Sequence, residues 1–334
     1  MQGFTLTMDY LAFTVPSTTL EEVTALLGGD WTKVEAGYLG YPLCWVTEGE
    51  SRGTGKIGMG APRKLHEAHV DLTSGVVASW PSEKMQAVLI WIKEKGGHLT
   101  RIDCALDDRA MSVPLDWIKV AIKTGQIVTR ASQAHILSGE DLDLWATTGE
   151  TVSIGSRRSQ TFLRIYDKRL ELTAKGQPDA NEYGIRWELE LKKDRADALG
   201  QLLRCHPIEE WRELVVGVLQ SYVDFRDTDK AAEPWTRYRA ARLPWWESLT
   251  EGFKKCRLVV EQARRTIEHV KEWVNRSLAP MLALVVAAPG AGRSWLDQVI
   301  TAGPVRWKER HYRLLKVPKP NREYVLRPSL GGQP

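Results

Sequence analysis

The sequence of 334 residues lacks the features of several large protein classes. Its four cysteines stand singly and far apart, so they form neither a zinc-site spacing nor a disulfide framework, and we expect them to be reduced packing residues. The longest apolar run, residues 279–288, is too short to cross a bilayer, which needs about 20 residues. The polar N-terminus lacks the basic and then apolar pattern of a secretory signal. These absences favour a cytoplasmic protein with no membrane partner.

Charge is unevenly distributed along the chain. Overall, 46 Lys and Arg face 42 Asp and Glu, a formal charge of +4. Residues 231–334 hold 19 basic and 9 acidic side chains, or +10, which leaves −6 for residues 1–230. A basic C-terminal region suits DNA, because cations that neutralise phosphates release counterions. The alternative is a basic surface kept only for solubility.

Hydrophobic periodicity predicts an α+β fold with a mainly antiparallel sheet, packed helices and a smaller helical C-terminal module. Strands are expected over 5–15, between 33 and 77, and over 99–107, 127–130 and 150–168; helices are expected from Thr18 and over 82–95, 114–123, 194–205 and 208–222. This length predicts two domains. We expect a nicking domain over 1–226, a linker over 227–249, a basic helical DNA-binding module over 250–316 and a basic, disordered tail over 317–334.

The expected linker interleaves aromatic rings with cations, among them Arg237 and Arg239. Aromatic rings can stack on unpaired bases, so these arginines are predicted DNA-binding residues. The alternative is a tryptophan-rich seam between two domains.

One strand-like run, residues 161–171, places a tyrosine among cations. Alternation with a period of two puts Arg164, Tyr166 and Lys168 on one face, together with Phe162. A phenol held in that way is equipped to attack phosphate. An ordinary half-buried strand with a solvated charged face gives the same pattern.

Acidic strands lie on both sides of this run. Asp103 and Asp107 are about 13 Å apart along one strand, too far to share an ion, whereas Glu188 and Glu190 are about 6.6 Å apart on one face of the other. Hard cations prefer carboxylate oxygens, so Asp103, Glu188 and Glu190 are the predicted ligands of Mg²⁺ or Mn²⁺. In the structural alternative, the two glutamates pair with arginines.

Five segments, taken together and in order, resemble the replication initiation factor (Rep_trans) family of rolling-circle initiators. They are MDYLAFTVP from residue 8, HVDLTSG from 69, RIDCALDD from 101, IGSRRSQTFLRIYDKRLE from 154 and RWELELK from 186. Members are carried by plasmids, filamentous phages and mobile elements. The resemblance covers most of the chain and implies a DNA endonuclease and ligase whose tyrosine attacks one origin strand, keeps the 5′ phosphate and frees a 3′ hydroxyl. Tyr166 falls on the family's nucleophile position.

A mechanism in which Tyr166 attacks phosphate gives roles to the neighbouring residues, and the resemblance implies a set of partners. Arg164 and Lys168 would stabilise the phenolate and the phosphorane, while Arg157 and Arg158 would hold the DNA backbone. Solvated loop charges are the alternative for the last two. The implied partners are origin DNA, a second copy in a homodimer, and a host helicase and polymerase.

Several alternatives stay open. The seven histidines never occur as a pair separated by one apolar residue, which disfavours a histidine-based nickase. A conjugative relaxase of the same family would use the same chemistry, and a catalytically silent origin-binding regulator would keep only the scaffold. Whether His69, Asp71 or Asp107 joins the site is not fixed by the sequence.

Overall fold

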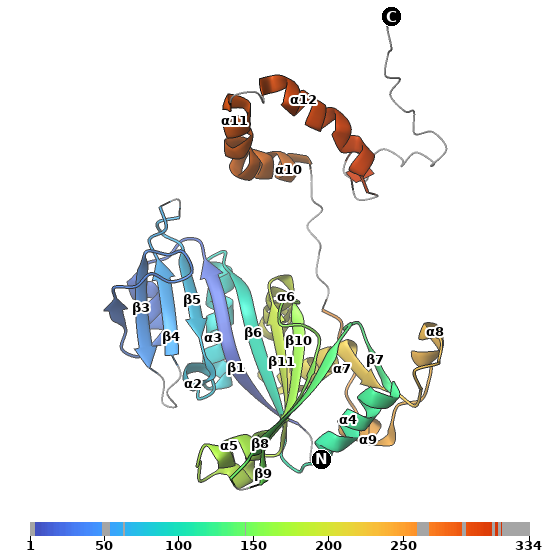
Figure 1. The fold of residues 1–334 in the computed structure, drawn as a ribbon. Helices are drawn as coiled ribbons and strands as arrows, with labels where there is room; N and C mark the ends of the chain where they lie inside the picture. Colours follow the sequence, from blue (N-terminus) through green and yellow to red (C-terminus); the bar gives the residue numbers. More distant parts are fainter. Residues whose placement is uncertain are drawn as a thin grey trace, which may run out of the picture. The chain divides into compact units, whose positions relative to one another are not determined.

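The computed structural model describes residues 4–48, 54–62, 64–143, 145–258, 267–288, 292–308, 311, 312 and 315, and it divides the chain into two compact units, residues 1–260 and 261–334. The strands are β1 (Thr5–Val15), β2 (Thr32–Val34), β3 (Leu43–Glu48), β4 (Thr54–Met59), β5 (Ala68–Leu72), β6 (His98–Asp108), β7 (Ile127–Thr129), β8 (Ala134–Asp141), β9 (Ala146–Ile154), β10 (Thr161–Asp167), β11 (Ile185–Lys192) and β12 (Val223–Phe225). The α-helices of the first unit are α1 (Leu20–Leu27), α2 (Ser74–Val77), α3 (Ser82–Glu94), α4 (Leu115–Thr124), α5 (Lys168–Ala174), α6 (Asp194–Arg204), α7 (Trp211–Tyr222), α8 (Pro234–Arg237) and α9 (Pro244–Leu249) (Figure 1).

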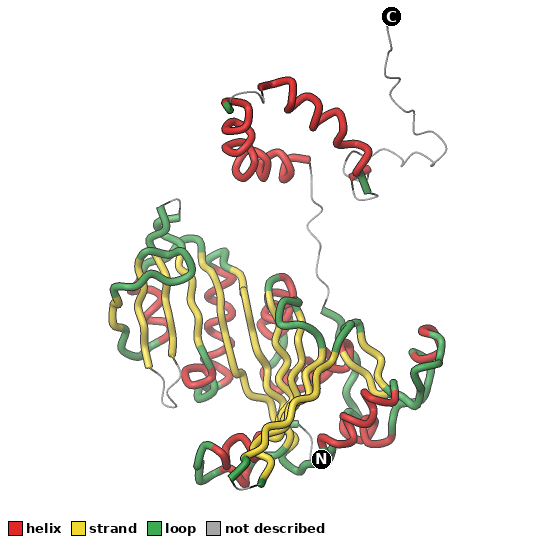
Figure 2. The backbone as a smooth tube through the Cα atoms, in the orientation of Figure 1, coloured by secondary structure: helices red, strands yellow, loops and turns green. Residues whose placement is uncertain are grey.

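Ten strands form one sheet in the order β2-β3-β4-β5-β1-β6-β11-β10-β9-β8, and β12 pairs with β7 in a small second sheet (Figure 2). Every pairing between these named strands is antiparallel. The predicted α+β class with a mainly antiparallel sheet is therefore confirmed.

The two faces of the large sheet differ in chemistry. On β11, Trp187, Leu189 and Leu191 point to the face covered by α3, α6 and α7, and all three are at most 1% exposed. Arg186 and the two glutamates of β11 alternate with them and point to the opposite face. Because both sets are buried, β11 has an apolar core on one side and a polar network on the other.

Local signals in the sequence set the predicted helix ends. The Thr19 hydroxyl accepts a hydrogen bond from the Glu22 amide while the Glu22 carboxylate accepts one from the Thr19 amide, which is the expected capping box of α1. Helix α4 ends at Gly125, whose φ of 87° is left-handed, and a Cβ there would lie 2.7 Å from the Lys230 amide nitrogen.

The segment 227–249 is not a linker, because it packs into the first unit. Trp246 is fully buried, with its ring centroid 5.5 Å from that of Trp187 and 5.3 Å from that of Phe225. Its indole N–H donates to Asp224 Oδ1 at 2.8 Å. Burial of such a large ring contributes about 1.5–3 kcal/mol to the stability of the fold, and it holds this segment against the sheet.

The described helices of the second unit are α10 (Ile267–Trp273), α11 (Ala279–Ala287) and α12 (Gly292–Ala302), with a π-helical turn, Val274–Leu278, between the first two. The expected tail over 317–334 lies outside the described residues. Within the described part of the chain, no helix is both long and apolar enough to traverse a bilayer. Cys44 and Cys104 are buried as expected, but Cys205 is exposed.

Candidate active site

Strand register gathers the predicted site residues on the polar face of β10, β11 and β6. Tyr166 on β10 lies opposite Arg186, which in turn lies opposite Asp107 on β6. Two residues along, Arg164 lies opposite Glu188. The third row consists of Phe162, Glu190 and Asp103. Side chains on a shared face of a strand repeat every second residue, so these three strands form one polar network, although β6 ends more than fifty residues before β10 begins.

Tyr166 is buried in this network, with 8% of its surface exposed. Its hydroxyl donates to Glu188 Oε2 at 3.4 Å, and Arg164 Cζ lies 5.2 Å from the ring centroid. Burial raises the pKa of Tyr166, the Glu188 carboxylate raises it further, and Arg186 and Arg164 oppose that change. The cations were expected to favour the phenolate, but burial outweighs them and the phenol holds its proton at neutral pH.

Glu188 is the residue that joins Tyr166 to a cation. Arg164 Nη2 lies 2.6 Å from Oε1 and 2.5 Å from Oε2 of this carboxylate, which is only 5% exposed. Arg164 Nε is buried and has no hydrogen-bond partner among the described residues. The Glu188 carboxylate is therefore fixed beside the phenol and can accept its proton.

Asp103 and Glu190 share a second arginine. Arg101 donates to Asp103 from Nε at 2.9 Å and from Nη2 at 2.5 Å, and its Nη2 lies 2.8 Å from Glu190 Oε2. Lys192 Nζ lies 2.5 Å from Glu190 Oε1. Burial raises the pKa of Asp103 to about 7, and the Glu190 and Glu188 carboxylates raise it as well. Arg101 acts in the opposite direction and lowers this pKa.

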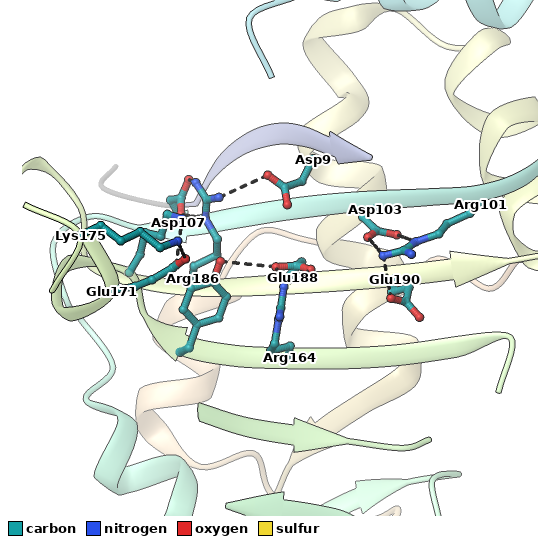
Figure 3. A network of polar contacts seen from close by, with 12 residues as sticks. Asp9, Arg101, Asp103, Asp107, Arg164, Glu171, Lys175, Arg186, Glu188 and Glu190 are labelled. Carbon is teal, nitrogen blue, oxygen red and sulfur yellow. Dashed lines mark hydrogen bonds and ion pairs between the residues drawn. The ribbon is translucent and has the colours of Figure 1, made fainter. Parts of the chain in front are cut away.

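Arg186 and Asp9 belong to the same network, although neither was predicted (Figure 3). Arg186 holds Asp107 through two bonds of 2.7 and 2.9 Å, and its Nη1 lies 3.5 Å from Asp9 Oδ1. The register of β1 against β6 shifts between Met8 and Tyr10, so Asp9 is the extra residue of a β-bulge. Burial and the nearby Glu188 carboxylate raise the pKa of Asp9.

The donor chemistry of this face suits a hard divalent cation. Asp103, Glu188 and Glu190 are buried carboxylates on adjacent strands, and their mutual repulsion contributes to the raised pKa of Asp103. Each of them, however, is ion-paired with an arginine, and for Glu188 and Glu190 this is what the structural alternative expected. Across the described residues, no group of three or more His, Cys, Asp or Glu is arranged to hold a metal. Binding a metal through these three residues would require the arginines to release them.

Comparison with known proteins shows the family. Residues 97–300 match the sequence model of the family described as "Replication initiation factor", and they cover more than half of the chain. The chain belongs to the replication initiation factor family. The predicted resemblance is therefore confirmed, and the matched residues include β6, β10 and β11.

Two further similarities agree with this family. The chain is 25% identical over 228 residues to the "Putative DNA relaxase NicK" of Bacillus subtilis (strain 168). That match covers 67% of this chain but 62% of the relative, so it spans less than two thirds of that protein's length. The structure titled "Structure of Rolling Circle Replication Initiator Protein from Geobacillus stearothermophilus" has a similar fold, with a TM-score of 0.62, 19% identity, and coverage of 77% of this chain and 99% of that one.

Lys168 lies near Tyr166 as predicted, but it belongs to a helix rather than to the strand. Strand β10 ends at Asp167, whose side chain accepts a hydrogen bond from the Leu170 amide, and Lys168 is the first residue of α5. Its Nζ still lies 5.8 Å from the Tyr166 ring centroid, but it donates to Glu171 at 2.9 Å. The side chain of Asp167 caps the N-terminus of α5, so the helix begins at Lys168, although the alternation typical of a strand continues through that residue in the sequence.

The four predicted DNA-binding arginines have different surroundings. Arg157 and Arg158 are exposed on the β9–β10 loop, and Arg157 Cζ lies 5.3 Å from the ring centroid of Phe162. Arg239 is exposed, with Cζ 5.8 Å from the ring centroid of Trp235. Arg237 donates to the carbonyls of residues 232 and 230, so it braces a turn.

A second polar cluster lies on β1 and β5, on the same face of the sheet. Asp71 accepts hydrogen bonds from the hydroxyls of Tyr10 and Tyr38, the latter at 2.5 Å. His69 is 8% exposed, its Nδ1 lies 2.9 Å from Thr14 Oγ1, and its ring stacks on that of Tyr38 at 6.2 Å. None of these contacts involves Tyr166, so His69 and Asp71 form a cluster separate from it.

Proposed function

We propose that this protein initiates rolling-circle replication by nicking one strand of origin DNA with Tyr166 and later rejoining it. The observation that carries the proposal is the buried contact between the Tyr166 hydroxyl and Glu188, whose carboxylate is held by Arg164. This arrangement supplies a nucleophile, a proton acceptor and a cation for phosphate on one face of the sheet. Membership of the replication initiation factor family supports the same reaction class.

In the proposed step, the Tyr166 oxygen forms a bond to phosphorus as the bond from phosphorus to the 3′ oxygen breaks. The tyrosine proton passes to Glu188, and the departing 3′ oxygen takes up a proton from solvent water to become a hydroxyl. Arg164 and Lys168 stabilise the charge on the phosphorane oxygens. The phosphotyrosine keeps the energy of the phosphodiester, so attack by a 3′ hydroxyl rejoins the strand without ATP.

A bound Mg²⁺ or Mn²⁺ is part of the proposal, with Asp103, Glu188 and Glu190 as its ligands. Such an ion would polarise the scissile phosphate and neutralise developing charge. Asp9 adds a fourth carboxylate near Glu188 and is a further candidate ligand.

The proposal also includes a path for the DNA and a set of partners. Arg157 and Arg158 are exposed on the β9–β10 loop, just before β10, where they can contact the DNA backbone. Arg239 and Trp235 together offer a cation and an aromatic ring to single-stranded DNA. A homodimer, a host helicase and a polymerase are the partners that this reaction would use.

A conjugative relaxase is the second candidate function, because the relative from Bacillus subtilis is described as a DNA relaxase. It would use the same nicking chemistry to start strand transfer. A silent origin-binding regulator would have no need of the buried contact between Tyr166 and Glu188.

The test is covalent capture of DNA by the full-length protein. Purified protein is incubated with supercoiled or single-stranded DNA bearing its own element's origin, with Mg²⁺ or Mn²⁺, and the adduct is measured on a denaturing gel. Tyr166→Phe should abolish the adduct. Tyr10→Phe is the matched control, because Tyr10 is a half-buried tyrosine of the same polar face and, like Tyr166, lies beside an arginine. An adduct that persists in Tyr166→Phe and disappears in Tyr10→Phe would reassign the nucleophile.

Removal of the divalent cation tests the metal separately. With EDTA, nicking should fall to background while binding of the origin DNA is kept, and Mn²⁺ should restore the adduct. Full nicking after exhaustive chelation would contradict a metal requirement and leave the tyrosine assignment intact.

A further inference from the structure

A groove of about 640 Å³ opens on the first unit outside the Tyr166 network. It is lined by the turn after β7, the β9–β10 loop, the C-terminal end of α7, and residues 255–258. Tyr166 and the acidic residues near it are not part of the lining. The volume lies within the range of about 300–1,000 Å³ typical of small-ligand sites.

Two buried polar groups in this lining have no partner. Gln220 is 1% exposed, and its amide nitrogen donates to the Thr250 carbonyl at 3.4 Å, which fixes the orientation of the amide. Its Oε1, and the Oγ of the adjacent Ser221, make no hydrogen bond to any described residue. Native proteins rarely leave a buried acceptor unpaired, so the pair indicates a ligand that carries an N–H or O–H donor.

The rim of the groove carries cations that are free to meet an anion. Arg130 and Arg257 are exposed and make no ion pair within the described part of the chain. Lys255, in contrast, lies 2.6 Å from Asp224, the one carboxylate in the lining. Arg226 also pairs with Asp224, at 2.7 Å, so this carboxylate does not repel an anion. Two unpaired guanidinium groups suit phosphate.

The lining also offers an aromatic ring and several hydroxyls. Tyr238 is 59% exposed at the groove, where its ring is open to stack on a planar group. Further hydroxyls come from Thr129, Ser132, Ser156 and Ser159. Because an acceptor, a ring and guanidinium groups occur together, the ligand combines a hydrogen-bonding planar base with a phosphate.

We propose that this groove binds one nucleotide unit of single-stranded DNA, with the base directed to Gln220 and Ser221 and the phosphates to Arg130 and Arg257. The proposal rests on the proposed function in taking DNA as the polymer. The β9–β10 loop connects the two sites, because Ser156 and Ser159 line the groove while the neighbouring Arg157 packs on Phe162 of the polar face. Thr161 lines the groove, and the five residue steps from Thr161 to Tyr166 span roughly 16 Å along β10.

Photo-crosslinking and affinity measurements on the full-length protein test this site. The probe is a 20-nucleotide oligo(dT) that carries a single 5-iododeoxyuridine, with dTMP as the free-nucleotide arm. We expect crosslinks to residues 129–132 or 218–222, and an oligonucleotide Kd that rises about tenfold in the Arg130→Ala, Arg257→Ala double variant. Ser221→Ala, which leaves both charges in place, should weaken the groove crosslink.

The matched control is a Lys93→Ala, Lys123→Ala double variant, which removes two exposed charges outside the groove and should leave the Kd within about twofold. Crosslinks found only elsewhere, or an equal loss of affinity in both double variants, would overturn the proposal. So would displacement of the probe by dTMP at the same nucleotide concentration, since the site would then bind free nucleotides. Failure of the nicking function would show as the absence of any covalent DNA adduct with the wild-type protein, a readout independent of these binding data.

Discussion

The polar face of the sheet has two halves that hold their carboxylates in different ways. Around β10 and β11, arginines pair with them, as Arg164 does with Glu188 and Arg186 with Asp107. Around β1 and β5, tyrosine hydroxyls donate to them, as Tyr38 does to Asp71. Each half contains a tyrosine near an arginine, Tyr166 in the first and the half-buried Tyr10 in the second, so a tyrosine and a cation alone do not define a catalytic site.

The two halves differ in the number of tyrosine hydroxyls that donate to one carboxylate. Asp71 is occupied by the hydroxyls of Tyr10 and Tyr38, whereas Tyr166 approaches Glu188 at 3.4 Å without a second phenol. The guanidinium of Arg164 also remains beside the Tyr166 ring, where it can meet phosphate. Under the proposed function, the first half carries the chemistry and the second holds strands together.

The largest expected effect comes from Glu188→Gln, which keeps the shape of the side chain but removes its ability to take the tyrosine proton. We expect the nicking rate to fall about 10²- to 10⁴-fold. The rate should be measured at saturating Mn²⁺, so that weaker metal binding does not limit it. Glu67→Gln is the control from the other half, where Glu67 accepts from Tyr41 at 2.6 Å, and it should nick normally. Equal rates in the two variants would remove the distinction between the halves.

The next effect is on stability. Arg186→Met leaves Asp107, which is 2% exposed, without its partner, and loss of one member of a buried pair costs about 3–5 kcal/mol. Asp71→Asn keeps an oxygen that can accept from Tyr38, so it should cost only about 1 kcal/mol. Urea unfolding of both variants measures the difference. Similar losses would mean that ion pairs and neutral hydrogen bonds stabilise this face equally.

Much of this arrangement could be predicted from the sequence, because it follows from periodicity. Alternation along residues 161–167 and 186–192 predicts two half-polar strands, and their facing glutamates and arginines follow from antiparallel pairing. Residues 131–149 gave no prediction, although they form most of the β8–β9 hairpin. Strand β8 is largely exposed on both faces, so it lacks the apolar alternation that marks a half-buried strand.

The partners inside the network could not be predicted in the same way. By alternation Asp9 should point toward the core with Leu11, and only the β-bulge turns it to Arg186. A charged residue at a core position was the available signal. The packing of Trp246 against the sheet could not be predicted for another reason. Prolines and small residues give a segment the sequence pattern of a linker whether or not one of its aromatic rings is buried.

The smallest effect we predict is on pH dependence, in the half built on β1 and β5. Burial lowers the pKa of His69, and His98 lowers it further, whereas the Asp71 and Glu67 carboxylates oppose this shift. The unfolded chain then binds more protons than the folded chain as pH falls through about 6.5, so acid destabilises the fold. His69→Gln removes this contribution and keeps an acceptor for Thr14. The loss of stability between pH 7.5 and 5.5, measured from urea midpoints, should be smaller in His69→Gln than in wild type, while nicking at pH 7.5 is unchanged. An identical pH dependence would mean that His69 binds a proton as readily in the folded chain as in the unfolded chain. A loss of nicking would mean that the two halves act as one site.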